Sequence, residues 1–176
     1  MNIFLIGYRC TGKTAVGRRL SHRLGLSFMD ADVELESAYG LTIRQIVSSE
    51  GWDVFRKMER SILEQLCRQA ETVVATGGGV VMVRGNVEMM RASGVLVWLQ
   101  ASAETIRKRM LADVKTALQR PALTRRDLDD EIEQTLSRRL PLYAAAMDFK
   151  VETDRLDIDA VSDQLRDKLK AYGIGG

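Results

Sequence analysis

The sequence predicts an α/β fold with a central five-stranded parallel sheet flanked by helices. Short apolar runs alternate with longer segments whose apolar residues recur at helical spacing. The short runs are rich in Val and Ile without polar alternation, which is typical of strands buried on both faces. A β-α-β-α order implies right-handed crossovers and helices on both sides of the sheet. A length of 176 residues suits one compact domain, which we expect to span 1–176.

Each predicted element rests on its own pattern. The predicted strands are residues 3–6, 26–29, 72–75, 95–99 and 149–152. Residues 13–24 place Val16, Leu20 and Leu24 on one stripe, which predicts a helix after the first strand. Residues 43–70 continue such spacing over a length that indicates more than one helix, and residues 157–172 predict a C-terminal helix.

The composition excludes several classes of protein. The formal net charge is +2, from 26 basic and 24 acidic residues, which gives no reason to expect a nucleic-acid or membrane partner. The two cysteines, Cys10 and Cys67, are too few for a disulfide framework and indicate free thiols in a reducing compartment. No targeting segment is visible, and no apolar run approaches the roughly 18 residues of a membrane span. We therefore expect a cytoplasmic protein, and a monomer because no interface stripe is evident.

The stretch GYRCTGKT, from Gly7 to Thr14, fits the pattern G-x-x-x-x-G-K-[ST] between a predicted strand and a predicted helix. Glycines allow a tight loop whose N–H groups converge, and the following helix presents its positive end to an anion. Lys13 supplies a charge for the β- and γ-phosphates, and Thr14 offers a hydroxyl to Mg²⁺. The loop therefore predicts binding of a nucleoside triphosphate by Cys10, Thr11, Gly12, Lys13, Thr14 and Ala15. Cys10 is either a tolerated small residue or a thiol activated by the helix N-terminus.

Three further groups have two interpretations each. Asp30 and Asp32 share one side of an extended segment and point into the crevice at the strand ends, or they are acids at a helix N-terminus. Arg56 and Glu59 share a helix face as site residues or as a surface ion pair. The consecutive Gly77, Gly78 and Gly79 give a ligand close access to the backbone, or form a hinge.

Residues 111–126 interrupt the regular alternation of elements. This stretch mixes charged and small residues and includes Pro121, one of two prolines in the chain. It is either a surface helix followed by a linker or a mobile lid over a site, because lids are drawn from weakly packed segments.

The order of motifs resembles the shikimate kinase family over nearly the whole chain. After the phosphate loop come D-x-D, F-R-x-x-E, G-G-G, R-P-x-L and R-x-P-L-Y, the last two beginning at Arg120 and Arg139. The sequence RPALT departs slightly from the R-P-L-L of the family, but it leaves Arg120 in register. The resemblance implies a three-layer P-loop kinase fold with a lid at about 111–126 and a substrate-binding insertion at about 31–61.

The resemblance also implies an activity and residue roles. The activity is ATP-dependent phosphorylation of the 3-hydroxyl of shikimate, a step of chorismate and aromatic amino-acid biosynthesis. Lys13, Asp32 and Arg120 would be catalytic, and Thr14 and Asp30 would hold Mg²⁺. The shikimate-binding residues would be Asp32, Arg56, Gly77, Gly78, Gly79 and Arg139. Arg109, Arg120 and Arg155 would complete the ATP site, with Arg109 and Arg155 near the adenine.

Two other functions stay open at this point. The first is a small P-loop kinase for a nucleotide or gluconate, although two arginines suit a carboxylate better than a base. The second is a nucleotide-binding regulatory module without catalysis, although Lys13, Asp32 and Arg120 are all present. Trp52 and Phe55 either flank a substrate pocket or pack in the core.

Overall fold

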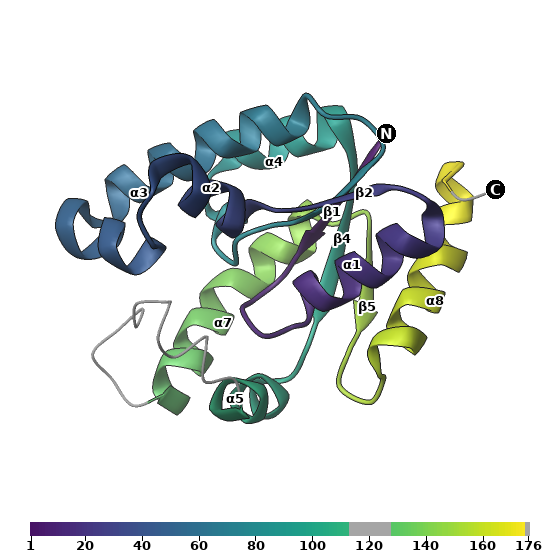
Figure 1. Ribbon diagram of the computed structural model, residues 1–176. Coiled ribbons are helices and arrows are strands. Elements are labelled where there is room, and N and C mark those ends of the chain that lie inside the picture. The colour runs from purple at the N-terminus through teal and green to yellow at the C-terminus, as the bar shows by residue number, and fades with distance from the viewer. Residues whose placement is uncertain (113–127, 175–176) are drawn as a thin grey trace.

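A parallel five-stranded sheet forms the centre of the computed structural model, which describes residues 1–112 and 128–174 (Figure 1). The strand order is β2-β3-β1-β4-β5, and all four neighbouring pairs are parallel. The strands are β1 (Asn2–Ile6), β2 (Ser27–Asp30), β3 (Thr72–Ala75), β4 (Gly94–Gln100) and β5 (Phe149–Glu152). The predicted five-stranded parallel sheet is confirmed.

Helices follow the strands and cover both faces of the sheet. The α-helices are α1 (Lys13–Leu24), α2 (Ala31–Tyr39), α3 (Ile43–Cys67), α4 (Arg84–Ser93), α5 (Ala103–Ala112), α7 (Leu128–Ala146) and α8 (Ile158–Leu169). Two 3₁₀ turns cover Val80–Met82 and Lys170–Tyr172. Helix α3 is interrupted at Gly51, where φ is 84° and ψ is 173°, so the prediction of more than one helix in this stretch is correct.

The core has two main layers because the strand residues alternate between the faces. Phe4 and Ile6 of β1 pack with α2, α3, α4 and α7 on one side. Ile3 and Leu5 pack with α1 and α8 on the other side. A smaller cluster joins α5, α7 and the phosphate loop, and its buried members are Tyr8, Ala101, Ile106, Ile132 and Leu136. This third cluster lies at the carboxyl end of the strands, so it supports the site.

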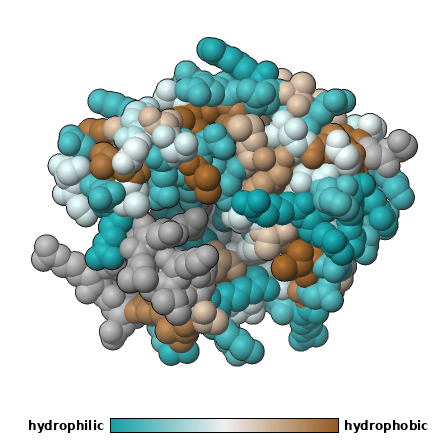
Figure 2. All heavy atoms as spheres, in the orientation of Figure 1, coloured by the Kyte–Doolittle hydropathy of each residue, from teal (hydrophilic) through white to brown (hydrophobic). Residues whose placement is uncertain are grey.

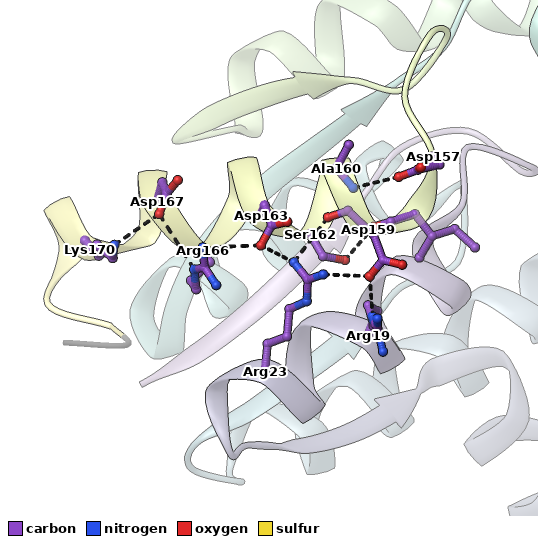
Figure 3. A network of polar contacts seen from close by, with 11 residues as sticks. Arg19, Arg23, Asp157, Asp159, Ala160, Ser162, Asp163, Arg166, Asp167 and Lys170 are labelled. Atoms are coloured by element: carbon purple, nitrogen blue, oxygen red, sulfur yellow. Dashed lines mark hydrogen bonds and ion pairs between the residues drawn. The ribbon is translucent and has the colours of Figure 1, made fainter.

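The contact between α1 and α8 includes a buried apolar stripe. Figure 3 shows the ion-pair network that joins the same two helices at the surface. Arg19 and Arg23 of α1 contact Asp159 of α8 at 2.5 and 2.6 Å, and Arg23 also pairs with Asp163. Exposed pairs of this kind contribute about 0–1 kcal/mol each. The buried stripe, which includes Leu20 of α1, therefore provides most of the stabilisation of this contact.

The outer surface is mostly hydrophilic on the face drawn in Figure 2, where exposed apolar residues lie in separate small groups. Within residues 1–112 and 128–174, no helix has both the length and the hydrophobicity that crossing a bilayer requires. Met82 and Leu142 are among the exposed large apolar side chains.

The sheet register brings the site elements together. Leu5, near the end of β1, lies opposite Ala75 at the end of β3, and Ala75 also lies opposite Asp30 at the end of β2. Thr76 fixes the next turn, because its N–H and its hydroxyl both donate to Leu5 O, at 3.1 and 2.9 Å. The loops that leave these three strands therefore meet at one edge of the sheet, where open α/β folds bind their ligands.

Candidate active site

The phosphate loop joins the end of β1 to the start of α1. Gly7 has φ 142°, and a Cβ there would lie 2.4 Å from Leu99 O, so only glycine fits this position. Lys13 is buried, and its Nζ donates to Gly7 O at 2.8 Å and to Tyr8 O at 2.7 Å. These bonds hold the ammonium group over the loop at the N-terminus of α1, where an anionic phosphate is favoured.

Arg109 connects this loop to the end of β5. Its Nη1 donates to Cys10 O at 3.3 Å and to Thr153 Oγ1 at 3.0 Å, and its Nη2 donates to Thr153 O at 2.7 Å. Cys10 is partly exposed and has φ 60°, an uncommon conformation for a residue other than glycine. Arg155 follows two residues after Thr153 and is exposed. Arg109 therefore lies beside the phosphate loop.

Asp30 and Asp32 do not share one side of an extended segment, so that prediction is wrong. Asp30 ends β2 and caps α2, where its Oδ1 accepts from the N–H of Asp32 at 3.1 Å. Asp32 lies in the first turn of α2, as the alternative of helix N-terminal acids required. The change in backbone direction separates the carboxylates: Asp30 Oδ2 accepts from Thr14 Oγ1 at 2.6 Å, whereas Asp32 Oδ1 borders Gly77.

A cavity lies next to the phosphate loop and is bordered by the three consecutive glycines. Its lining residues come from the phosphate loop, α2, α3, the turn after β3, and α7. They are Arg9, Asp32, Ile43, Trp52, Phe55, Arg56, Glu59, Gly77, Gly78, Gly79 and Arg139. Trp52 and Phe55 meet edge to face, with ring centroids 5.7 Å apart. The structure supports both interpretations of these aromatic residues, because Phe55 belongs to the main core cluster, Trp52 packs against that cluster, and both line the cavity.

The glycines give neighbouring side chains close access to the cavity. A Cβ on Gly77 would lie 2.8 Å from Glu59 Oε1 and 3.0 Å from Asp32 Oδ1. A Cβ on Gly79 would lie 2.2 Å from Arg56 Nη2. Gly77 and Gly79 do not have positive φ, so their requirement for glycine comes from close approach rather than from backbone conformation.

Arg56 and Glu59 form a largely buried ion pair, so the alternative of a surface pair is wrong. Arg56 Nη1 donates to Glu59 Oε2 at 2.6 Å, and Glu59 is 5% exposed. Burial raises the pKa of the Glu59 carboxyl, and Arg56 opposes this shift without cancelling it. In the part of the chain that the structure describes, Glu59 Oε1 is buried without a hydrogen-bond partner. The pair thus fixes the Arg56 guanidinium at the cavity wall.

Arg139 and Tyr143 of α7 hold the middle glycine. Arg139 Nη1 donates to Gly78 O at 3.2 Å, and the Tyr143 hydroxyl donates to the same oxygen. Burial raises the pKa of Tyr143 well above its usual range, so this hydroxyl stays a donor. Arg139 is 8% exposed, which places a second guanidinium at the cavity in a largely desolvated position.

The structure brings most of the predicted site residues together. Asp32, Arg56, Gly77, Gly78, Gly79 and Arg139 line one cavity. Lys13, Thr14 and Asp30 meet at the phosphate loop. Arg120 and nearly all of the predicted lid at 111–126 lie outside the described residues. Sequence reasoning missed Arg9, whose partner Glu131 is 122 residues away, so no local pattern could have revealed it.

A phosphate loop beside an arginine-lined cavity defines the class as a P-loop kinase that acts on a small anionic acceptor. Comparison with known proteins makes this more specific. The family model described as shikimate kinase matches residues 9–170. The shikimate kinase of Moorella thermoacetica is 39% identical over 171 residues, covering 97% of this chain and 95% of the relative. Shikimate kinase 2 of Dickeya chrysanthemi is 40% identical over 150 residues, covering 85% and 86%.

Solved structures agree with these sequence relatives. A shikimate kinase from Acinetobacter baumannii, described as a complex with shikimate, matches with a TM-score of 0.90 and 30% identity, covering 97% of this chain and 93% of that chain. The Bacillus subtilis YorR protein, at 13% identity and a TM-score of 0.66, shares the fold alone. The chain belongs to the shikimate kinase family.

This membership makes the chain an ATP-using phosphotransferase with shikimate kinase activity, which phosphorylates the 3-hydroxyl of shikimate in aromatic amino-acid biosynthesis. Neither a kinase for nucleotides or gluconate nor a regulatory module without catalysis is supported.

Proposed function

We propose that the arginine-lined cavity is the shikimate pocket and that the phosphate loop beside it holds the triphosphate of ATP. The observation that carries this proposal is the meeting of Arg56 from α3, Arg139 from α7 and Asp32 from α2 at one cavity. The solved relative in complex with shikimate supports the choice of acceptor.

In this proposal Arg56 and Arg139 bind the carboxylate of shikimate. A guanidinium matches a carboxylate with two parallel hydrogen bonds, which fixes the orientation of the acceptor as well as its affinity. Glu59 holds Arg56 in place, and Gly77, Gly78 and Gly79 let the ring approach the backbone. The residues from about 31–61 act as the substrate-binding insertion, because six of the eleven lining residues come from this range.

We propose that Asp32 contacts the acceptor hydroxyl of shikimate. Its carboxylate borders Gly77 at the cavity, on the side where α2 follows β2. Phosphoryl transfer passes through a loose transition state, so Asp32 need not be a strong base. It orients the hydroxyl oxygen towards the γ-phosphate and accepts its proton late in the reaction.

The nucleotide is held by the phosphate loop in this proposal. Backbone N–H groups of residues 10–15 surround the phosphates, and the ammonium of Lys13 offsets charge on the transferring group. Arg109 and Arg155 lie towards the adenine, and Arg109 is already anchored by Thr153 and the carbonyl of Cys10. Arg120 stays a predicted phosphate contact, and 111–126 stays a predicted lid.

The residues Thr14 and Asp30 fit a magnesium ion. Both offer oxygen atoms, which this ion prefers, and they lie 2.6 Å apart at the phosphate loop. Residues 1–112 and 128–174 contain no cluster of three or more His, Cys, Asp or Glu suited to a metal. Mg²⁺ is commonly held by one or two protein groups together with the phosphates of the substrate. When bound, Mg²⁺ would neutralise charge on the phosphate oxygens.

A monomeric state and a cytoplasmic location are further parts of the proposal. On the face drawn in Figure 2 the exposed apolar residues lie in separate small groups. This supports a monomer, because a subunit interface is usually marked by a large contiguous apolar patch. The two cysteines, which form no disulfide, suit a reducing compartment.

The direct test is a coupled assay of ADP release with shikimate, gluconate and nucleoside monophosphates as separate acceptors. We expect Mg²⁺-dependent turnover with shikimate alone. Turnover with gluconate or a nucleotide at a comparable kcat/KM would contradict the assignment of the pocket, and full activity in excess EDTA would contradict the magnesium site.

A further inference from the structure

Arg9 is a third arginine of the cavity that none of the sequence motifs explains. It lies in the phosphate loop, is 8% exposed, and lines the cavity together with Arg56 and Arg139. A Cβ on Gly78 would lie 3.4 Å from the backbone N of Arg9 and 3.7 Å from Arg139 Nη1. Arg9 and Arg139 therefore border the same glycine, on the side of the cavity where the carboxylate is proposed to bind.

A buried acid holds the Arg9 side chain. Arg9 Nη2 forms an ion pair with Glu131 Oε1, and Glu131, in the first turn of α7, is 3% exposed. This arrangement resembles the Arg56–Glu59 pair, whose guanidinium lines the same cavity. Both pairs place a helix carboxylate behind a guanidinium, and both leave the guanidinium at the cavity wall.

Part of the Arg9 guanidinium is left for a ligand. Within the described residues, its Nε is buried and has no hydrogen-bond partner. A buried donor of this kind is costly unless a ligand or water accepts its proton. Arg9 and Arg139 also flank the same ring, with their guanidinium carbons 5.7 and 5.9 Å from the centroid of Tyr8. Two cations beside one ring favour an anion that they share.

We propose that Arg9 donates a hydrogen bond to the carboxylate of the acceptor, as a third arginine beside Arg56 and Arg139, and that Glu131 is the residue that positions it. Three arginines and two carboxylates line the cavity, so the lining favours an anionic acceptor. This inference rests on the assignment of the cavity as the shikimate pocket.

The main test removes the Arg9 donor without leaving a buried charge. In the double variant Arg9→Met/Glu131→Gln both members of the pair become neutral and keep similar volumes. We expect KM and Kd for shikimate to rise roughly tenfold or more, as for loss of one hydrogen bond to a charged group. KM for ATP and the melting temperature should change little. The single variant Arg9→Lys keeps a charge opposite Glu131 but loses Nε, and should also raise KM for shikimate.

A comparison of shikimate with its methyl ester tests whether Arg9 contacts the carboxylate of the acceptor. The ester has no charged carboxylate, so loss of Arg9 should weaken binding of shikimate but not of the ester. The ratio of the Kd of the ester to the Kd of shikimate should therefore fall in the double variant by the factor by which the Kd of shikimate rises. Equal weakening of both ligands together with a lower melting temperature would indicate a structural role and overturn the proposal. Unchanged binding of shikimate with a lower kcat would place Arg9 at the transferring phosphoryl group and would also overturn it.

Two further variants distinguish failure of the role proposed for Arg9 from failure of the pocket assignment. Arg23→Met/Asp163→Asn removes an ion pair between α1 and α8 whose residues do not line the cavity, and should leave KM for shikimate unchanged. Arg56→Lys tests the pocket itself. If Arg56→Lys raises KM for shikimate and the Arg9 variants do not, the role of Arg9 is wrong and the pocket stands. If neither changes KM, the assignment of the pocket is wrong.

Discussion

Replacing Gly79 with alanine should damage substrate binding while leaving the fold intact. The added Cβ would lie 2.2 Å from Arg56 Nη2 and 2.7 Å from Cζ, where ordinary contact begins at 3.4 Å. The guanidinium must therefore move away from residue 79 by about 1 Å. This displacement disrupts its 2.6 Å hydrogen bond to Glu59 and changes its orientation towards the cavity. A displacement of this size in a group that orients a substrate can cost about 100-fold in rate.

The expected loss of binding follows from the contact that is lost. A hydrogen bond between charged groups contributes about 1.5–3 kcal/mol, so KM for shikimate should rise roughly 10- to 100-fold. KM for ATP should not change, because Gly79 borders Arg56 and not the phosphate loop. The melting temperature should fall, because the weakened bond leaves the buried Glu59 carboxyl without its full ion-pair partner, but the variant should still fold because Gly79 does not have positive φ.

Gly85→Ala is a matched control. Its Cβ would lie 2.7 Å from Arg60 Nη1, so the same substitution displaces another arginine. The Arg60 side chain is 49% exposed and pairs with Glu64 on the surface, away from the cavity lining. The assay is ADP release at saturating ATP with varied shikimate, together with thermal unfolding of each variant. A folded Gly79→Ala enzyme whose KM for shikimate stays within twofold of wild type would refute the reasoning.

Three other predictions follow from the same geometry. Arg56→Lys keeps the charge but loses the planar fork, so KM for shikimate should rise while KM for ATP stays constant; an unchanged KM for shikimate would contradict this. Asp32→Asn should abolish turnover while calorimetry still detects binding of both substrates; loss of folding would instead indicate a structural role. The raised pKa of buried Glu59 means that the native state binds more protons than the unfolded state between pH 4.5 and that pKa. Stability relative to Glu59→Gln should therefore fall as pH rises through this window, and urea unfolding that shows a rise would contradict the assignment.

The strands and the first helix were predictable because their signals are local. Strands buried on both faces appear as continuous apolar runs, and each predicted strand agrees with an observed one to within one residue at either end. The predicted helix at 13–24 agrees with α1 because its stripe packs directly on the sheet. The phosphate loop was identifiable because its chemistry requires fixed residue types at fixed spacing.

The backbone around Asp32 was not predicted correctly. The D-x-D pattern appeared extended, whereas α2 begins at Ala31. A signal was present in the sequence, since Asp30 is a favourable N-cap and Gly40 ends the helix in the left-handed conformation. The helix is short and rich in acidic residues, so its apolar spacing was too weak to indicate it.

Burial and long-range pairing were also beyond local sequence reasoning. The spacing of Arg56 and Glu59 shows that they share a helix face, but only packing of α3 against the turn after β3 buries the acid. Arg9 and Glu131 meet because the phosphate loop and α7 converge in the tertiary structure. Nothing in either local sequence indicates that contact.

A crystal structure with shikimate and a non-hydrolysable ATP analogue would test directly whether the arginine-lined cavity binds shikimate beside the phosphate loop. We expect electron density for the shikimate ring against the three consecutive glycines, with its carboxylate oxygens within hydrogen-bonding distance of Arg56 and Arg139. Density for the acid elsewhere, or in this cavity with its carboxylate directed away from both guanidinium groups, would contradict the account.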